Sequence, residues 1–158
     1  MGGYFTTGAA NQWAVQALSP NAAGMGLFVM GRLAVQGRKS GAVELEKGKG
    51  VLLYALETPE PVYEDLGSAT LNGGQAVVNI EPIFARTVNT AMDYLVFLTP
   101  EGPNASLYVA RKSPSFFEVR SIDGPDIRFN WRVVAKQKDN ENIRLESIDL
   151  PDPGKVKE

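Results

Sequence analysis

Carboxylates and tyrosines gather in one short segment, and they are the residues of this chain best suited to chemistry. The set comprises Glu57, Glu60, Glu64, Asp65, Tyr54 and Tyr63. A glycosidase needs two carboxylates about 5 to 10 Å apart in a cleft lined by aromatic side chains. Pro59 and Pro61 keep this segment extended, however, so we interpret it as a solvated loop without catalytic residues. A carboxylate-dependent carbohydrate-active enzyme is therefore the least favoured class of function.

The chain contains neither cysteine nor histidine. These absences exclude disulfides, zinc thiolate sites, thiol nucleophiles and every mechanism in which histidine is the general base. We expect a protein that is not an enzyme and that needs no cofactor.

Two acidic turns, at residues 123–126 and 139–142, offer oxygen atoms to a calcium ion. Neither matches the twelve-residue loop that ends in a bidentate glutamate. We interpret both as turns between strands, and we predict no metal site.

The overall charge argues against nucleic-acid binding. The net charge is −2, with 44% hydrophobic and 22% charged residues, so no counterion release would drive association with a phosphate backbone. The segment 128–136 alternates as a strand, which puts Arg128, Asn130 and Arg132 on a solvent face and the intervening Phe129 and Trp131 in the core. No run of about 18 apolar residues predicts a membrane span.

The N-terminal region has an unusual composition. Residues 1–43 hold eight of the sixteen glycines, and their only charges are Arg32, Arg38 and Lys39. A flexible linker would not carry the many large apolar side chains found there. We predict that this region is buried against something else.

Two short runs within residues 24–40 alternate like strands, and Gly31 separates them. Glycine allows tight bends and close backbone approach, as a β segment wound from several chains requires. Ordinary strands with glycine bulges inside a single-chain sandwich remain the alternative. The predicted oligomer interface consists of Leu27, Phe28, Val29, Met30, Leu33 and Val35.

Beyond an expected hinge at residues 37–50, strand and turn signals recur about every ten residues, which is typical of an antiparallel sandwich or barrel. Asn72-Gly73-Gly74 predicts a hairpin between its flanking strands. Pro82 predicts the start of one short helix of about ten residues. Residues 11–18 fit either a second helix or turns. The strand signals lie at 51–57, 69–71, 76–80, 94–99, 107–110, 116–121 and 128–136.

The predicted fold class is therefore mainly β, a sandwich or barrel-like domain with one short helix, preceded by a glycine-rich oligomerising β segment. We expect an assembly segment at 1–41, a β-rich domain at 42–148 and a charged, proline-containing tail at 149–158.

Two parts of the chain carry a family resemblance. Residues 26–40, GLFVMGRLAVQGRKS, resemble the last shaft repeat of phage tail-fibre-like and bacterial fibre-like proteins. The β-rich terminal domains that follow such shafts are similar to residues 63–67, 94–102, 107–110, 116–120 and 129–136. The resemblance implies a homotrimer in a virion or an extracellular fibre, and it implies no catalytic residues. With one repeat only, a baseplate, spike-tip or capsid-decoration protein fits the length.

The function we expect is structural: a homotrimeric virion or fibre component for particle assembly or attachment, with other virion or fibre proteins as partners. The alternative is a glycan- or receptor-binding surface module of a bacterium. That module would use a shallow groove near Tyr54, Tyr63 or Tyr108 and would bind a cell-surface glycan.

Overall fold

The computed structural model describes residues 14, 15, 17, 19, 24–102, 106–122 and 126–150. The chain divides into two compact units, Met1–Leu56 and Glu57–Glu158. This division lies further along the chain than the predicted end of the assembly segment at residue 41. The second helix proposed for residues 11–18 lies mostly outside the described residues, as does the tail from Asp149.

The regular structure described in the first unit is one hairpin, in which β1 (Ser40–Glu46) pairs with β2 (Lys49–Tyr54). Gly48 turns the chain with φ 77°, a conformation that glycine adopts without strain. Its N–H donates a 2.9 Å hydrogen bond to the Glu44 carboxylate. The prediction of a hinge at residues 37–50 was therefore wrong, because the glycines and charges at its C-terminal end form a hairpin turn.

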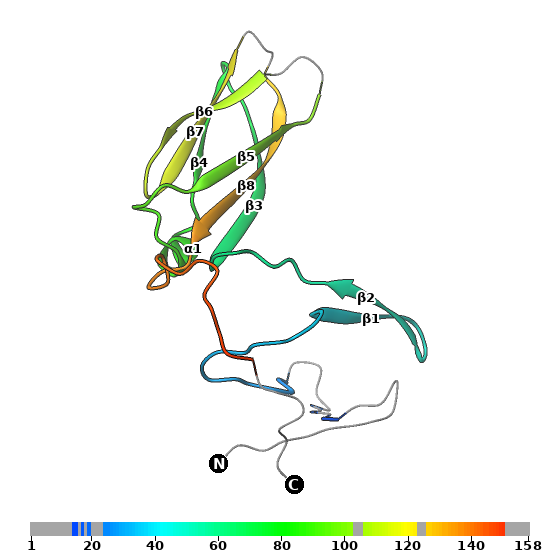
Figure 1. The fold of residues 1–158 in the computed structure, drawn as a ribbon. Helices are drawn as coiled ribbons and strands as arrows, with labels where there is room; N and C mark the ends of the chain where they lie inside the picture. The colour runs from blue at the N-terminus through cyan, green and yellow to red at the C-terminus, as the bar shows by residue number, and fades with distance from the viewer. Residues whose placement is uncertain are drawn as a thin grey trace. The chain divides into compact units, whose positions relative to one another are not determined.

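The second unit is a sandwich of two three-stranded antiparallel sheets, β3-β8-β5 and β4-β7-β6 (Figure 1). It confirms the predicted mainly β fold and settles the architecture as packed sheets rather than a closed barrel. The strands are β3 (Val62–Thr70), β4 (Gln75–Asn79), β5 (Leu95–Pro100), β6 (Ser106–Lys112), β7 (Phe116–Ile122) and β8 (Arg128–Lys136).

The core of the sandwich comes from alternate residues of the two central strands. Phe129 and Val133 of β8 face Phe117 and Val119 of β7, and all four are almost completely buried. The Trp131 ring meets the Phe117 ring edge to face, with centroids 5.6 Å apart. Burial of such side chains contributes about 1.5–3 kcal/mol each. The predicted inward face of residues 128–136 is confirmed.

The turn at residues 72–74 is present, with positive φ at Gly73 and Gly74, but the hairpin predicted around it was wrong. The strands on its two sides, β3 and β4, belong to different sheets. Leu71 explains the difference. Its side chain is 2% exposed, and its N–H donates to the carbonyl of Ile127, so the chain crosses from one sheet to the other to bury it.

The predicted helix is present as α1 (Pro82–Thr87), although it is shorter than expected. The Glu81 carboxylate caps it by accepting a 2.6 Å hydrogen bond from the N–H of Phe84. Val88 ends the helix because it adopts an extended conformation and is buried in the core.

Asp126 fixes the crossing between the two sheets, because its carboxylate accepts hydrogen bonds of 2.8 Å from Gly74 N–H and 2.9 Å from Gly73 N–H. These bonds lower the pKa of Asp126 below its ordinary value of 3.8. A lowered folded-state pKa stabilises the fold above the unfolded-state pKa, and this stabilisation is lost as the pH falls through the folded-state pKa.

We therefore predict that Asp126→Asn lowers the free energy of unfolding at pH 7, and that the difference from the unmodified protein shrinks as the pH falls below about 4. Urea unfolding at pH 7 and pH 3 measures both effects. Asp149→Asn, which removes an exposed carboxylate, is the control and should have little effect. An equal loss of stability at both pH values would contradict the prediction.

Candidate functional site

The first unit exposes its apolar side chains. From Gly24 to Leu56 every residue is exposed. The six residues of the predicted interface range from 41% exposed at Val29 to 89% at Met30. Residues 24–39 contain no strand, and most of residues 1–23 lie outside the described residues, so the β conformation expected for the glycine-rich segment stays a prediction.

The hairpin of the first unit adds a second apolar surface. Val43 pairs with Val51 and Gly41 pairs with Leu53, so the side chains of Val43, Val51 and Leu53 share one face. All three are exposed. Sequence reasoning missed this face, although the alternation of Gly41, Val43 and Leu45 with polar or small neighbours was a usable signal. We call this face, together with the six predicted interface residues, the assembly surface.

The three tyrosines proposed as ligand contacts lie on separate elements. Tyr54 is in β2 of the first unit, where the Arg38 guanidinium lies 5.9 Å from its ring centroid. In the second unit, Tyr63 is on β3 and Tyr108 on β6, which belong to different sheets. The structure does not bring Tyr63 and Tyr108 into a common groove.

The clustered carboxylates are engaged in ion pairs or turned apart. Glu60 lies 3.1 Å from the Lys136 ammonium and 3.6 Å from the Arg144 guanidinium. The hydrogen bond from Lys136, together with both positive charges, lowers the Glu60 pKa. Glu64 and Asp65 are consecutive in β3, so their side chains leave opposite faces of the strand. Glu64 and Asp65 therefore do not form a facing pair.

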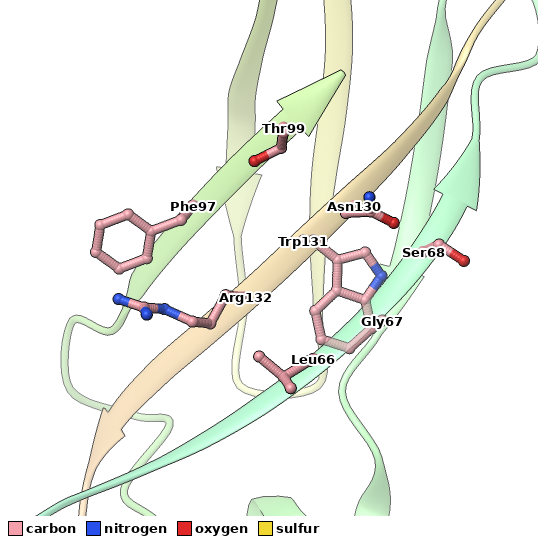
Figure 2. Close-up of a pocket in the computed structure, with 8 residues that line it drawn as sticks. All are labelled: Leu66, Gly67, Ser68, Phe97, Thr99, Asn130, Trp131 and Arg132. Atoms are coloured by element: carbon pink, nitrogen blue, oxygen red, sulfur yellow. The ribbon is translucent and has the colours of Figure 1, made fainter. Parts of the chain in front are cut away.

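An open groove of about 670 Å³ lies on the outer face of the sheet β3-β8-β5 (Figure 2). Strand register places its side chains in two rows that cross the sheet, one residue from each strand. The first row is Leu66, Arg132 and Phe97, and the second is Ser68, Asn130 and Thr99. Gly67 and Trp131 pair with each other between the rows.

The first row is built around a cation–π contact. The Arg132 guanidinium carbon lies 4.6 Å from the centroid of the Phe97 ring, a separation at which the ring quadrupole attracts the cation. On its other side the Arg132 Nε lies 3.6 Å from the Glu64 carboxylate. Ring and carboxylate together hold the guanidinium over the sheet.

A separate ion pair closes one end of the second row. Arg128 donates a 2.9 Å hydrogen bond to the Ser68 hydroxyl and lies 3.4 Å from the Glu101 carboxylate. The Asn130 amide donates to Glu101 at 2.8 Å. Arg128 is therefore neutralised by a neighbouring acid, and the Asn130 side chain is held in one orientation.

The sequence placed Arg128, Asn130 and Arg132 on one strand face, and the structure confirms this. The sequence did not show which residues of other strands would flank these three. Leu66 and Ser68 are alternate, outward-facing residues of β3, as Phe97 and Thr99 are of β5. Only the strand register shows that these four residues flank Arg132 and Asn130 of β8.

No family model matches this chain, and no curated protein matches it either. Among the described residues, no helix is both long and apolar enough to cross a membrane. The same residues hold no group of three or more acidic side chains arranged to bind a metal ion.

Gly67 couples the groove to the core, because the Trp131 indole fills the space where a side chain at position 67 would stand. A Cβ added at Gly67 would lie 2.3 Å from Cζ2 of that indole, which is itself packed against Phe117. We predict that Gly67→Ala lowers the free energy of unfolding by about 1–3 kcal/mol through overpacking.

Thermal unfolding followed by tryptophan fluorescence measures this effect. Thr70→Ala, an outward substitution in the same strand, should change stability by less than about 0.5 kcal/mol. Adding Trp131→Phe to Gly67→Ala should recover part of the loss, because the smaller ring leaves room. If Gly67→Ala unfolded at the same temperature as the unmodified protein, the overpacking argument would fail.

Proposed function

We propose that this protein is a structural, self-assembling component of a virion or extracellular fibre, and that copies associate through the assembly surface as a homotrimer. One observation carries the proposal. The unit Met1–Leu56 has large apolar side chains throughout its described part, yet none of them is buried. Large apolar side chains exposed in such number within one unit indicate an interaction site.

The contrast between the two units supports association through the first one. In the described part of the second unit, eleven hydrophobic residues are buried in a core of its own. Over residues 24–56, the first unit has one two-stranded hairpin, and a lone hairpin is marginally stable in water. Chains that cannot cover such surface alone can cover it against identical copies.

Two glycines in the assembly segment support the proposed winding of several chains. Gly31 and Gly37 have φ of 112° and 135°, and a Cβ at either position would meet nothing within 4 Å. Their conformation, not crowding within one chain, therefore requires glycine. The resemblance of residues 26–40 to a terminal shaft repeat is the basis for proposing three copies.

We predict that Leu33→Asp or Val29→Asp disrupts the oligomer, because a buried unpaired carboxylate at the interface is strongly destabilising. Light scattering should give about three times the 17.1 kDa chain mass for the unmodified protein and the monomer mass or aggregates for the variants. Val77→Asp is the matched control, since it changes an exposed valine on the sandwich. A monomeric unmodified protein, or an unchanged mass in both variants, would refute self-assembly through this surface.

A second prediction concerns the sandwich by itself. A chain of residues 57–150 should be monomeric and should unfold cooperatively, because its core is complete without the first unit. Sedimentation analysis and thermal unfolding would measure this. Association of this fragment to the same oligomer would place the main contact on the sandwich instead.

The second candidate function, a glycan- or receptor-binding module, is supported by the groove on the sheet β3-β8-β5. Attachment and assembly are compatible roles for one protein, since the assembly surface and the groove use different residues.

A further inference from the structure

The second row of the groove is made of neutral groups that both donate and accept hydrogen bonds. Ser68 and Thr99 supply hydroxyls and Asn130 supplies an amide. Because neighbouring strands lie about 4.8 Å apart, three strands span about 10 Å. This row suits a ligand that carries several hydroxyl groups along a flat body.

The first row supplies one positive charge, that of Arg132, beside the hydroxyl and amide groups of the second row. Glu64 approaches Arg132 from the Nε side. In the described part of the chain, the contacts of the Arg132 guanidinium are the ion pair to Glu64 through Nε and the stacking over Phe97. A guanidinium fork matches the geometry of a carboxylate, with two parallel hydrogen bonds. Leu66 and Phe97 offer apolar surface on either side of Arg132.

The direction of the groove distinguishes a saccharide from a peptide. An extended peptide binds a sheet by pairing its backbone with a free strand edge. The two rows instead cross β3, β8 and β5 over the face of the sheet (Figure 2), where the backbone groups of β8 already pair with both neighbours. Side chains alone are available for recognition there.

We infer that this groove binds an acidic saccharide, with the sugar carboxylate on Arg132 and the sugar hydroxyls on Ser68, Asn130 and Thr99. Glu64 competes with the ligand for the guanidinium, since both present a carboxylate. Because the groove is open, we expect one chain to bind the saccharide weakly, with a Kd on the order of 1 mM.

The sandwich contains a matched control for Arg132 on its other sheet. Arg111 lies 4.8 Å over the Phe116 ring and 3.6 Å from the Glu118 carboxylate, which is the same combination of arginine, phenylalanine and glutamate. There, however, Glu118 also binds Arg120 at 2.7 Å. The row next to Arg111 has the charged Arg120 between Tyr108 and Gln75, where the groove has the neutral Asn130 between Ser68 and Thr99.

The test uses the full-length chain with sialyllactose and with a glucuronate-containing tetrasaccharide. Lactose and the carboxyl-reduced tetrasaccharide are the neutral counterparts, and a glutamate-rich peptide is the non-sugar acid. Ligand-observed NMR and titration calorimetry measure affinity. We expect at least one acidic saccharide to bind, Arg132→Gln to weaken that binding about tenfold or more, and Arg111→Gln to leave it unchanged.

Two further variants keep the test decisive if Arg132→Gln destabilises the fold. Glu64→Gln should tighten acidic-saccharide binding several-fold, because it removes the competing carboxylate, and added salt should weaken binding. Thr99→Val should weaken it without changing the charge. Binding to neither acidic saccharide at millimolar concentration, equal binding of the neutral counterparts, or equal binding of the acidic peptide would overturn the inference.

Discussion

The two-faced strand β8 is the constraint on which the sandwich depends. It lies at the centre of its sheet and pairs along its length with β3 on one side and with β5 on the other. Its odd-numbered residues from Phe129 onward fill the core, and its even-numbered residues from Arg128 to Arg132 face solvent. A shift of one residue in register would exchange these two sets and expose the core. The register of β8 therefore fixes its core residues and its groove residues together.

The two units of the chain differ in how far they bury their apolar side chains. In the sandwich, the two sheets cover each other's apolar side chains. Leu71, where the chain crosses from β3 in one sheet to β4 in the other, is buried as well. In the first unit, the hairpin and residues 24–39 have side chains of similar character, and no second layer formed by described residues covers them. This difference in burial between the two units is the basis of the proposed self-association.

Local patterns in the sequence predicted most of the fold. The alternation at residues 128–136, the turn residues between strands and Pro82 predicted β8, the helix and parts of β2 to β7 in the right order, because each depends on near neighbours. Of β3 only the last residues were predicted, and β1 was not predicted. The pairing at Asn72-Gly73-Gly74 was wrong because turn chemistry does not reveal which sheet the next strand joins. The hairpin β1–β2 was missed because its glycines and charges also fit a hinge.

The groove could be predicted only in part for a related reason. Arg132 and Asn130 were correctly placed on an outer face, since that follows from alternation within one strand. Their neighbours Phe97, Thr99, Leu66 and Ser68 come from strands distant in sequence, and register between such strands is a property of the whole sandwich. The proposed tyrosines were chosen by composition, and the structure separates Tyr63 from Tyr108.

The late position of β8 in the chain also has a consequence for synthesis. Neither β3 nor β5 has another partner in its sheet, so this sheet cannot close until residues 128–136 have left the ribosome. Long-range pairing of this kind delays folding relative to local contacts. The glycine-rich segment and the hairpin β1–β2 emerge well before that moment. The N-terminal segment of a nascent chain is therefore outside the ribosome for an interval in which its own sandwich is still unfolded.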